Sequence, residues 1–213
     1  MSNSLNFISP PIAWHELSQP EPLALGILAS GSGSNFEAIA AAIEQEILNA
    51  QIRLVVYNNP EALVQKRAAS RQIPTQLLNH RDHDTREALD KEIVTAFQQA
   101  GVHWVIMAGW MRIVTPVLLT AFAERVINIH PSLLPSFPGI HAIEQSLDAG
   151  VKVTGCTVHF AEPKVDSGPI IAQAAVPIVA GDTAESLHER VQIQEHRIFP
   201  WAIALAAQKV RKS

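Results

Sequence analysis

The stretch LALGILASGSGSNF, residues 23–36, carries the pattern from which the fold is predicted. Its first seven residues form a short apolar run, which is typical of a strand covered on both faces. The cluster SGSGSN, 30–35, ends that run, and apolar residues recur at helical spacing from Phe36 onward. Ser34 and Glu37 form an S-x-x-E pattern, which predicts a capped helix start. The stretch therefore predicts a strand, a tight loop and a helix.

The same alternation continues along the chain. Strand-like runs lie at 52–57, 102–109, 125–129, 153–160 and 169–178, and helical patterns lie at 60–71, at 85–99 and from the Asp182/Glu185 pair onward. Alternating strands and helices favour a parallel sheet, while the short connections between the last strands favour antiparallel pairing. We therefore predict an α/β fold: a single open, mainly parallel Rossmann-like sheet, mixed at one edge, with helices on both faces.

The domain organisation follows from the same pattern. Residues 1–22 contain four prolines and no clear period, so we expect a tail that is poorly ordered or docked on the body. Residues 23–213 contain no visible boundary and are predicted to form one domain.

The amino-acid composition of the chain argues against several classes of binding partner. The chain has 213 residues, a net charge of −4 and one cysteine, Cys156. A nucleic-acid or membrane-surface protein usually shows a basic excess, which is absent here, so neither partner is expected. No apolar stretch approaches the roughly 18 residues of a membrane span. No Lys or Arg precedes Arg53, which argues against a secretory signal. We expect a cytoplasmic protein that is a monomer or a homodimer.

The glycine-rich cluster 30–35 is a candidate anion site. A strand–loop–helix of this kind presents backbone N–H groups and the positive end of the helix dipole, both of which favour phosphate. The dinucleotide fingerprint G-x-G-x-x-G fails, because Phe36 occupies the third glycine position, and no P-loop lysine follows. A single phosphate group is the predicted ligand, and a tight turn without any ligand is the alternative.

Asn128 and His130 lie at the end of a predicted strand, on the same side of it. An amide and an imidazole in this position could both donate hydrogen bonds to a developing oxyanion. Asp166 lies in the turn VDSGPII, and a carboxylate beside His130 would favour the charged imidazolium near neutral pH. The alternatives are a histidine that merely ends a strand and an aspartate that merely shapes a turn.

Two arginines could meet anionic ligands. Arg112 lies in MRIV, 111–114, just beyond the predicted strand at 102–109, and Arg86 lies near the start of a predicted helix. For Arg86 the alternative is an ordinary solvated charge. The other histidines lack metal-ligand spacing, so no metal is expected.

Five blocks of sequence together resemble the phosphoribosylglycinamide formyltransferases. They are SGSGSN (30–35), MAGWMRIV (107–114), INIHPSLLPSFPG (127–139), GCTVHFAEPKVDSGPII (155–171) and VQIQEHRIFP (191–200). The resemblance implies an enzyme of purine biosynthesis that moves a formyl group from 10-formyltetrahydrofolate, a co-substrate, to the amine of 5-phosphoribosylglycinamide. Residues 23–213 would then be the formyltransferase catalytic domain, and no metal would be required.

The resemblance also implies residue roles. The catalytic set would be Asn128, His130 and Asp166. The residues implied in binding the phosphoribosyl substrate are Gly33, Ser34, Asn35, Phe36, Met111 and Glu195, with Glu195 meeting the ribose. Those implied in binding the formyl folate are Arg86, Met111, Arg112, Ile113, Val114, Asn128, Val165 and Asp166.

Two alternatives remain open at this point. Another formyltransferase of the superfamily could act on methionyl-tRNA or a sugar-nucleotide amine, and a deformylase would use water as the acceptor. These relatives usually carry a further domain. A non-catalytic nucleotide- or folate-binding module is the alternative from a different class, and the complete set of Asn128, His130 and Asp166 argues against it.

Overall fold

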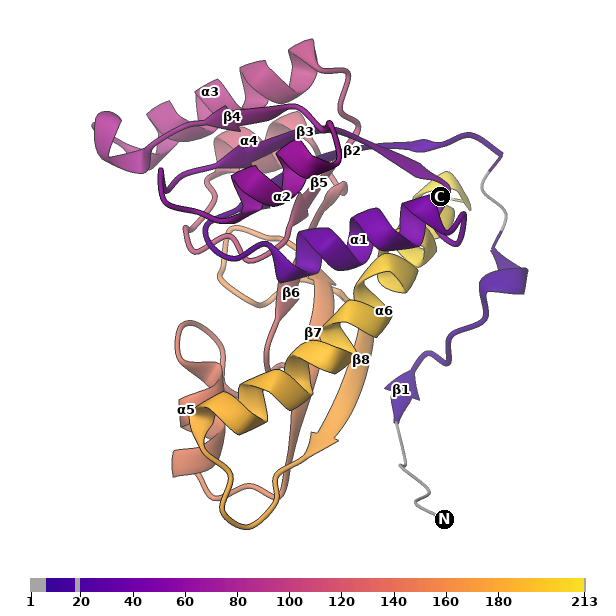
Figure 1. Ribbon diagram of the computed structural model, residues 1–213, viewed down its shortest axis with the longest axis vertical. Coiled ribbons are helices and arrows are strands. Elements are labelled where there is room, and N and C mark those ends of the chain that lie inside the picture. The colour runs from indigo at the N-terminus through magenta and orange to yellow at the C-terminus, as the bar shows by residue number, and fades with distance from the viewer. Residues whose placement is uncertain (1–6, 18–19, 213) are drawn as a thin grey trace.

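A computed structural model describes residues 7–17 and 20–212 of the chain. Eight strands form one sheet in the order β1-β8-β7-β6-β5-β2-β3-β4 (Figure 1). The strands are β1 (Ile8–Ser9), β2 (Leu23–Ala29), β3 (Ala50–Tyr57), β4 (Thr75–Leu77), β5 (Trp104–Met107), β6 (Val126–His130), β7 (Val153–Phe160) and β8 (Ile170–Pro177). Strands β2 to β6 pair in parallel, and β7, β8 and β1 add on in antiparallel pairs. The predicted mixed sheet is confirmed.

Helices cover both faces of this sheet. They are α1 (Ser34–Glu44), α2 (Val64–Ser70), α3 (Arg86–Gln99), α4 (Pro116–Ala121), α5 (Ala142–Asp148) and α6 (Ala184–Lys212). One apolar core lies between the sheet and helices α1, α2 and α6, and the other lies between the sheet and helices α3 and α4. All seven residues of β2 are buried, as its unbroken apolar run predicts for a strand between two helical layers. No helix in the described ranges is both long and apolar enough to cross a membrane.

The start of α1 differs from the predicted capping box. Gly33 is the residue before the helix, its φ is +75°, and no side chain caps the first turn. Glu37 instead binds Arg71, at 2.8 Å, and the Ser34 hydroxyl accepts a hydrogen bond from Gln192 on α6. The N–H groups of this first turn are therefore not used by a side-chain cap.

The start of α6 also differs in detail. Thr183 and Ser186 cap each other reciprocally through their hydroxyl and N–H groups, in place of the predicted Asp182/Glu185 pair. Asp182 binds Arg190 instead, and this ion pair together with the Val179 N–H holds the pKa of Asp182 well below its usual range.

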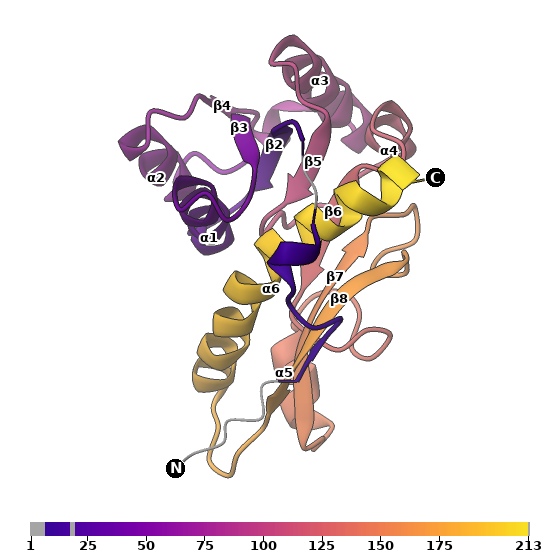
Figure 2. The ribbon, with the colours of Figure 1, turned by 90° about the vertical axis from the view of Figure 1, so that its right-hand side faces the viewer.

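Residues 7–17 lie along the edge of the sheet and beside α6 (Figure 2). β1 pairs with the middle of β8, and the Ala175 N–H donates to the Phe7 carbonyl at 2.9 Å. Trp14 packs edge to face against Trp201 of α6, with ring centroids 5.3 Å apart. These contacts place the described part of this segment on the body of the protein.

Candidate active site

A cavity of about 470 Å³ opens where β2, β5 and β6 end. Its walls are the loop that follows β2, the segment that follows β5, the end of β6, the loops around 139–142 and 161–166, and the first half of α6. In open α/β sheets this carboxyl edge is where ligands bind. The cavity therefore brings together most of the residues singled out in the sequence.

The loop 30–35 is fixed in position by its neighbours. A Cβ at Gly33 would lie 2.8 Å from Val64 of α2, and the positive φ of Gly33 is strained for any other residue. The Val64 N–H donates to the Gly31 carbonyl, and the Met111 N–H donates to the Ser30 hydroxyl at 2.9 Å. The uncapped first turn of α1 thus forms part of the cavity wall, as an anion site requires.

Glu195 lies beside this loop and is buried. The Asn35 side-chain amide donates to its carboxylate at 2.9 Å. Burial raises the pKa of Glu195, against the opposing effects of the Asn35 hydrogen bond and the charge of His188. Glu195 thus supplies a buried carboxyl group in the lining of the cavity.

The Glu195→Gln variant is expected to be more thermostable than the wild type at pH 8. The folded protein binds the proton of Glu195 more tightly than the unfolded chain does. Its contribution to stability is therefore complete below the ordinary pKa of 4.5 and is lost as the pH rises through the folded-state pKa. Glutamine keeps an acceptor for Asn35 without the charge. Differential scanning calorimetry should show Tm higher by about 2–4 °C at pH 8. The difference should shrink toward pH 5, and the opposite trend would contradict this account.

Asn128 and His130 point into the same cavity from β6. The His130 ring is nearly buried, and its Nε2 lies 2.8 Å from the Phe137 carbonyl oxygen. Its Nδ1 lies 3.3 Å from a carboxylate oxygen of Asp166. One ring nitrogen thus faces a carbonyl and the other faces a carboxylate, two groups that accept hydrogen bonds.

Asp166 is held in place by its own backbone and by its neighbours. Its φ of +51° is uncommon for a residue with a side chain, and the Gly139 N–H donates to its carboxylate at 2.7 Å. Burial raises the pKa of Asp166, but hydrogen bonding from His159 and Gly139 and the charges of His130 and His159 outweigh it. The pKa therefore lies below its ordinary value. Asp166 is thus a carboxylate at neutral pH.

His159 belongs to the site, whereas the sequence leaves it open between a core residue and a residue that supports the catalytic set. It pairs with Asn128 across β6 and β7, and its Nε2 lies 3.1 Å from the Asn128 amide and 3.6 Å from Asp166. Its Nδ1 contacts the Phe160 carbonyl, which fixes the ring. In the sequence, His159 is marked only by its position on a predicted strand, where it alternates with Thr157. The antiparallel register that brings it opposite Asn128 can be seen only in the folded structure.

The segment 111–114 forms the mouth of the cavity. Met111 is 75% exposed and Ile113 is 44% exposed, while Val165, which also lines the cavity, is 43% exposed. Exposed apolar side chains around a cavity mark a binding surface. Arg112 also lines the cavity, and its Nε is buried without a hydrogen-bond partner.

Two of the predicted binding residues lie apart from the cavity lining. The side chain of Phe36 is fully buried in the core, so only its backbone is available at the loop. Arg86 is exposed at the start of α3 and does not line the cavity. In the ranges that the structure describes, His, Cys, Asp and Glu side chains form no group of three that could hold a metal ion.

Comparison with known proteins gives one consistent result. The profile of the family described as "Formyl transferase" matches residues 24–203. The phosphoribosylglycinamide formyltransferase of Bacillus subtilis is 41% identical over 177 residues, which cover 83% of this chain and 91% of that protein. The Escherichia coli enzyme of that name is 40% identical over 178 residues, 84% of each chain. A solved structure, glycinamide ribonucleotide transformylase 1 of Symbiobacterium toebii, superposes with a TM-score of 0.87 at 42% identity, covering 90% of both chains.

Longer relatives match as well. The "Trifunctional purine biosynthetic protein adenosine-3" of Bos taurus is 42% identical over 193 residues, 91% of this chain, but this chain spans only 19% of that protein. The two bacterial relatives are matched over most of their length, and the region that matches the family, 24–203, contains the whole cavity lining. The chain therefore belongs to the formyl transferase family and, within it, to the phosphoribosylglycinamide formyltransferases.

Proposed function

We propose that this chain transfers the formyl group of 10-formyltetrahydrofolate to the primary amine of 5-phosphoribosylglycinamide, with residues 23–213 as the catalytic domain. The observation that carries the proposal is the meeting of Asn128, His130 and Asp166 in one cavity beside the uncapped start of α1. That arrangement supports the proposal, because the expected oxyanion donors and the expected phosphate loop line the same cavity.

In this proposal the phosphoribosyl substrate lies along the loop and α6. Its phosphate accepts hydrogen bonds from the first turn of α1, at Gly33, Ser34 and Asn35, with the Phe36 N–H adding to the same turn. Glu195 accepts hydrogen bonds from ribose hydroxyls. The substrate amine then lies near Met111, at the boundary between the two ligands.

The formyl donor occupies the other half of the cavity. The apolar rim of Met111, Ile113, Val114 and Val165 suits a flat ring system. Arg112, whose Nε is buried without a hydrogen-bond partner, lines this cavity. Arg86, outside the lining, would contact an acidic tail that extends past the mouth. Asn128 and Asp166 lie between the two halves.

The chemistry uses these groups in one addition and one elimination. The neutral amine attacks the formyl carbon, which forms a C–N bond and leaves negative charge on oxygen and positive charge on nitrogen. Asn128 and the His130 imidazolium stabilise that oxygen, after one of their present internal hydrogen bonds is exchanged for it. Asp166 holds His130 in its charged form and relays the proton from the attacking nitrogen toward N10 of the folate. The bond from the formyl carbon to N10 then breaks.

A formyl-transfer assay with the purified protein tests the proposal. We expect formation of tetrahydrofolate that depends strictly on 5-phosphoribosylglycinamide. Tetrahydrofolate released without an amine acceptor would instead indicate a deformylase. Formylation of methionyl-tRNA or of a sugar-nucleotide amine in parallel reactions would identify a different member of the superfamily.

A further inference from the structure

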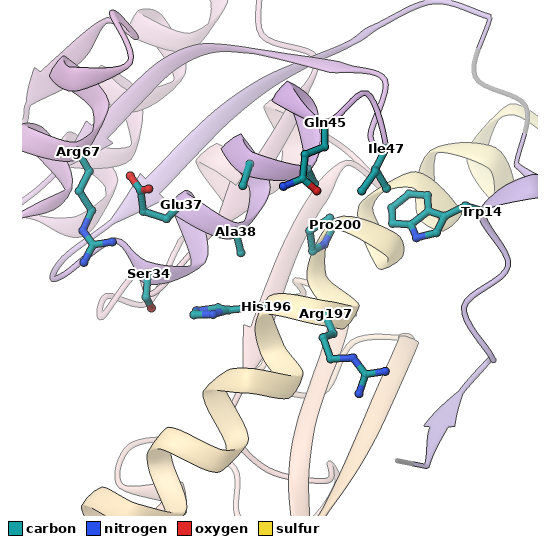
Figure 3. Close-up of a pocket in the computed structure, with 12 residues that line it drawn as sticks. Trp14, Ser34, Glu37, Ala38, Gln45, Ile47, Arg67, His196, Arg197 and Pro200 are labelled. Atoms are coloured by element: carbon teal, nitrogen blue, oxygen red, sulfur yellow. The ribbon is translucent and has the colours of Figure 1, made fainter. Parts of the chain in front are cut away.

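A second cavity, of about 480 Å³, lies on the outer side of the phosphate loop, between α1, α2 and α6 (Figure 3). Ser34 lines both cavities, so the second one begins where the proposed phosphate site ends. Arg67 of α2 and His196 of α6 lie at this end, and Figure 3 shows both side chains directed toward the neighbourhood of Ser34. Three helices thus bring polar groups to one side of the loop.

Arg67 differs from Arg71, the next arginine along the chain, in the partners of its guanidinium group. Arg71 binds both nearby carboxylates, Glu37 and Glu44, and these hydrogen bonds raise its pKa well above the ordinary value. The Arg67 backbone is hydrogen-bonded within the helix, but its guanidinium group has no ion pair or hydrogen bond to any residue in the described ranges. The carboxylate of Glu37 lines this cavity too, but it is already bound by Arg71. A guanidinium group therefore remains available beside Ser34.

His196 shows the same lack of a partner. Its Nε2 is buried and makes no hydrogen bond. Burial, followed by the positive charge of Arg67, lowers the pKa of His196. A buried ring nitrogen without a partner next to an unpaired cation is costly unless an anion or another acceptor joins them. The other arginine of this cavity, Arg197, donates to Gln194 and points away from Ser34 (Figure 3).

The described lining of the first cavity supplies a phosphate with only one permanently cationic side chain. Arg112 is the one arginine in its lining, it lies in the segment after β5, and no lysine is present there. Beside the loop lie the neutral side chains of Ser34, Asn35 and Gln192 and the buried carboxyl of Glu195, and the charge of His188 acts on that carboxyl. A dianionic phosphate monoester would gain from a permanent charge on the outer side of the loop.

We propose that Arg67, with His196 beside it, is a binding residue for the phosphate group of the substrate that the loop 33–35 holds. This inference rests on the proposed function and deepens it. The guanidinium closes the outer side of the phosphate site, and the His196 Nε2 supplies a further hydrogen bond once the anion is bound. The two groups would recognise the phosphate and leave the formyl donor untouched.

The test compares Arg67→Gln with Arg197→Gln, a matched control that removes an arginine from the same cavity. Arg67→Gln should raise KM for 5-phosphoribosylglycinamide by about tenfold or more, with kcat and KM for the formyl donor within about twofold of wild type. Arg197→Gln should leave all three unchanged. Arg67→Lys should recover part of the affinity, because it restores the charge without the planar guanidinium.

Titration calorimetry with ribose 5-phosphate provides an independent readout. Its Kd should rise by the same factor in Arg67→Gln, even if the wild type proved inactive in formyl transfer, so the two proposals can fail separately. An unchanged Kd would overturn the role of Arg67. Equal losses for ribose 5-phosphate and the formyl donor, or equal effects of the two arginine variants, would also overturn it, because they would indicate a structural role.

Discussion

Replacing His130 with alanine is expected to lower kcat by about 10²–10³-fold, the usual loss when one oxyanion donor is removed. The KM values for both substrates should change by less than about threefold, because the interaction is made mainly in the transition state. We expect His130 to contact the reacting oxygen as a hydrogen-bond donor, with Asp166, 3.3 Å away, as its partner at Nδ1. Asp166→Asn should cause a similar loss, because an amide cannot stabilise the imidazolium.

Steady-state kinetics over a range of both substrates, with single-turnover measurements of the transfer step, would check this. His103→Ala is a suitable control, because His103 is exposed and lies at the start of β5, at the opposite end from the cavity. It should retain full activity. Turnover close to the wild type in His130→Ala, or a loss confined to KM, would contradict the catalytic assignment.

The Gly33→Ala variant should lose affinity for the phosphoribosyl substrate, with KM higher by about 10–100-fold. A Cβ at this position would collide with Val64, and the backbone would have to leave its left-handed conformation. Either change moves the N–H groups of the first turn of α1. KM for the formyl donor should change little, because that half of the cavity does not touch Gly33. Calorimetric titration with ribose 5-phosphate would measure the effect directly.

Gly181→Ala is the control that separates general backbone strain from a local effect on the loop around Gly33. Gly181 also has a positive φ, of +85°, but a Cβ there would meet nothing within 4 Å. The variant should lose about 1 kcal/mol of stability through backbone strain, with KM unchanged. If Gly33→Ala behaved like Gly181→Ala, the loop would not be the phosphate site.

The local pattern of apolar residues was sufficient to predict much of the fold. The apolar run at 23–29 predicts a strand covered on both faces, and β2 is buried throughout because helices lie on both sides. The run at 153–160 predicts β7 with the bounds that the structure has. Such runs are informative because burial on two faces demands continuous apolar sequence. The short helices α4 and α5 were not predicted, since six or seven residues hold too few helical turns to show a period.

The site was harder to predict where it depends on residues distant in the sequence. The same-side placement of Asn128 and His130 follows from strand alternation, whereas their approach to Asp166 and His159 depends on the packing of β6, β7 and the loop after β7. The helix caps were mispredicted for a related reason. Ser34 and Glu37 match a capping pattern, but Gln192 and Arg71, remote in sequence, bind them instead. The local sequence pattern does not show when a residue remote in sequence will bind a side chain that could otherwise cap the helix.

The strand β1 has a consequence for handling the protein. It occupies only the middle of β8, yet it covers backbone groups that would otherwise be an open template for another chain. A shortened protein that begins at Leu23 would expose the backbone groups of β8 that β1 covers. We expect such a protein to aggregate by pairing of strands between molecules. Shortened versions made for crystallisation or fusion should therefore keep this segment.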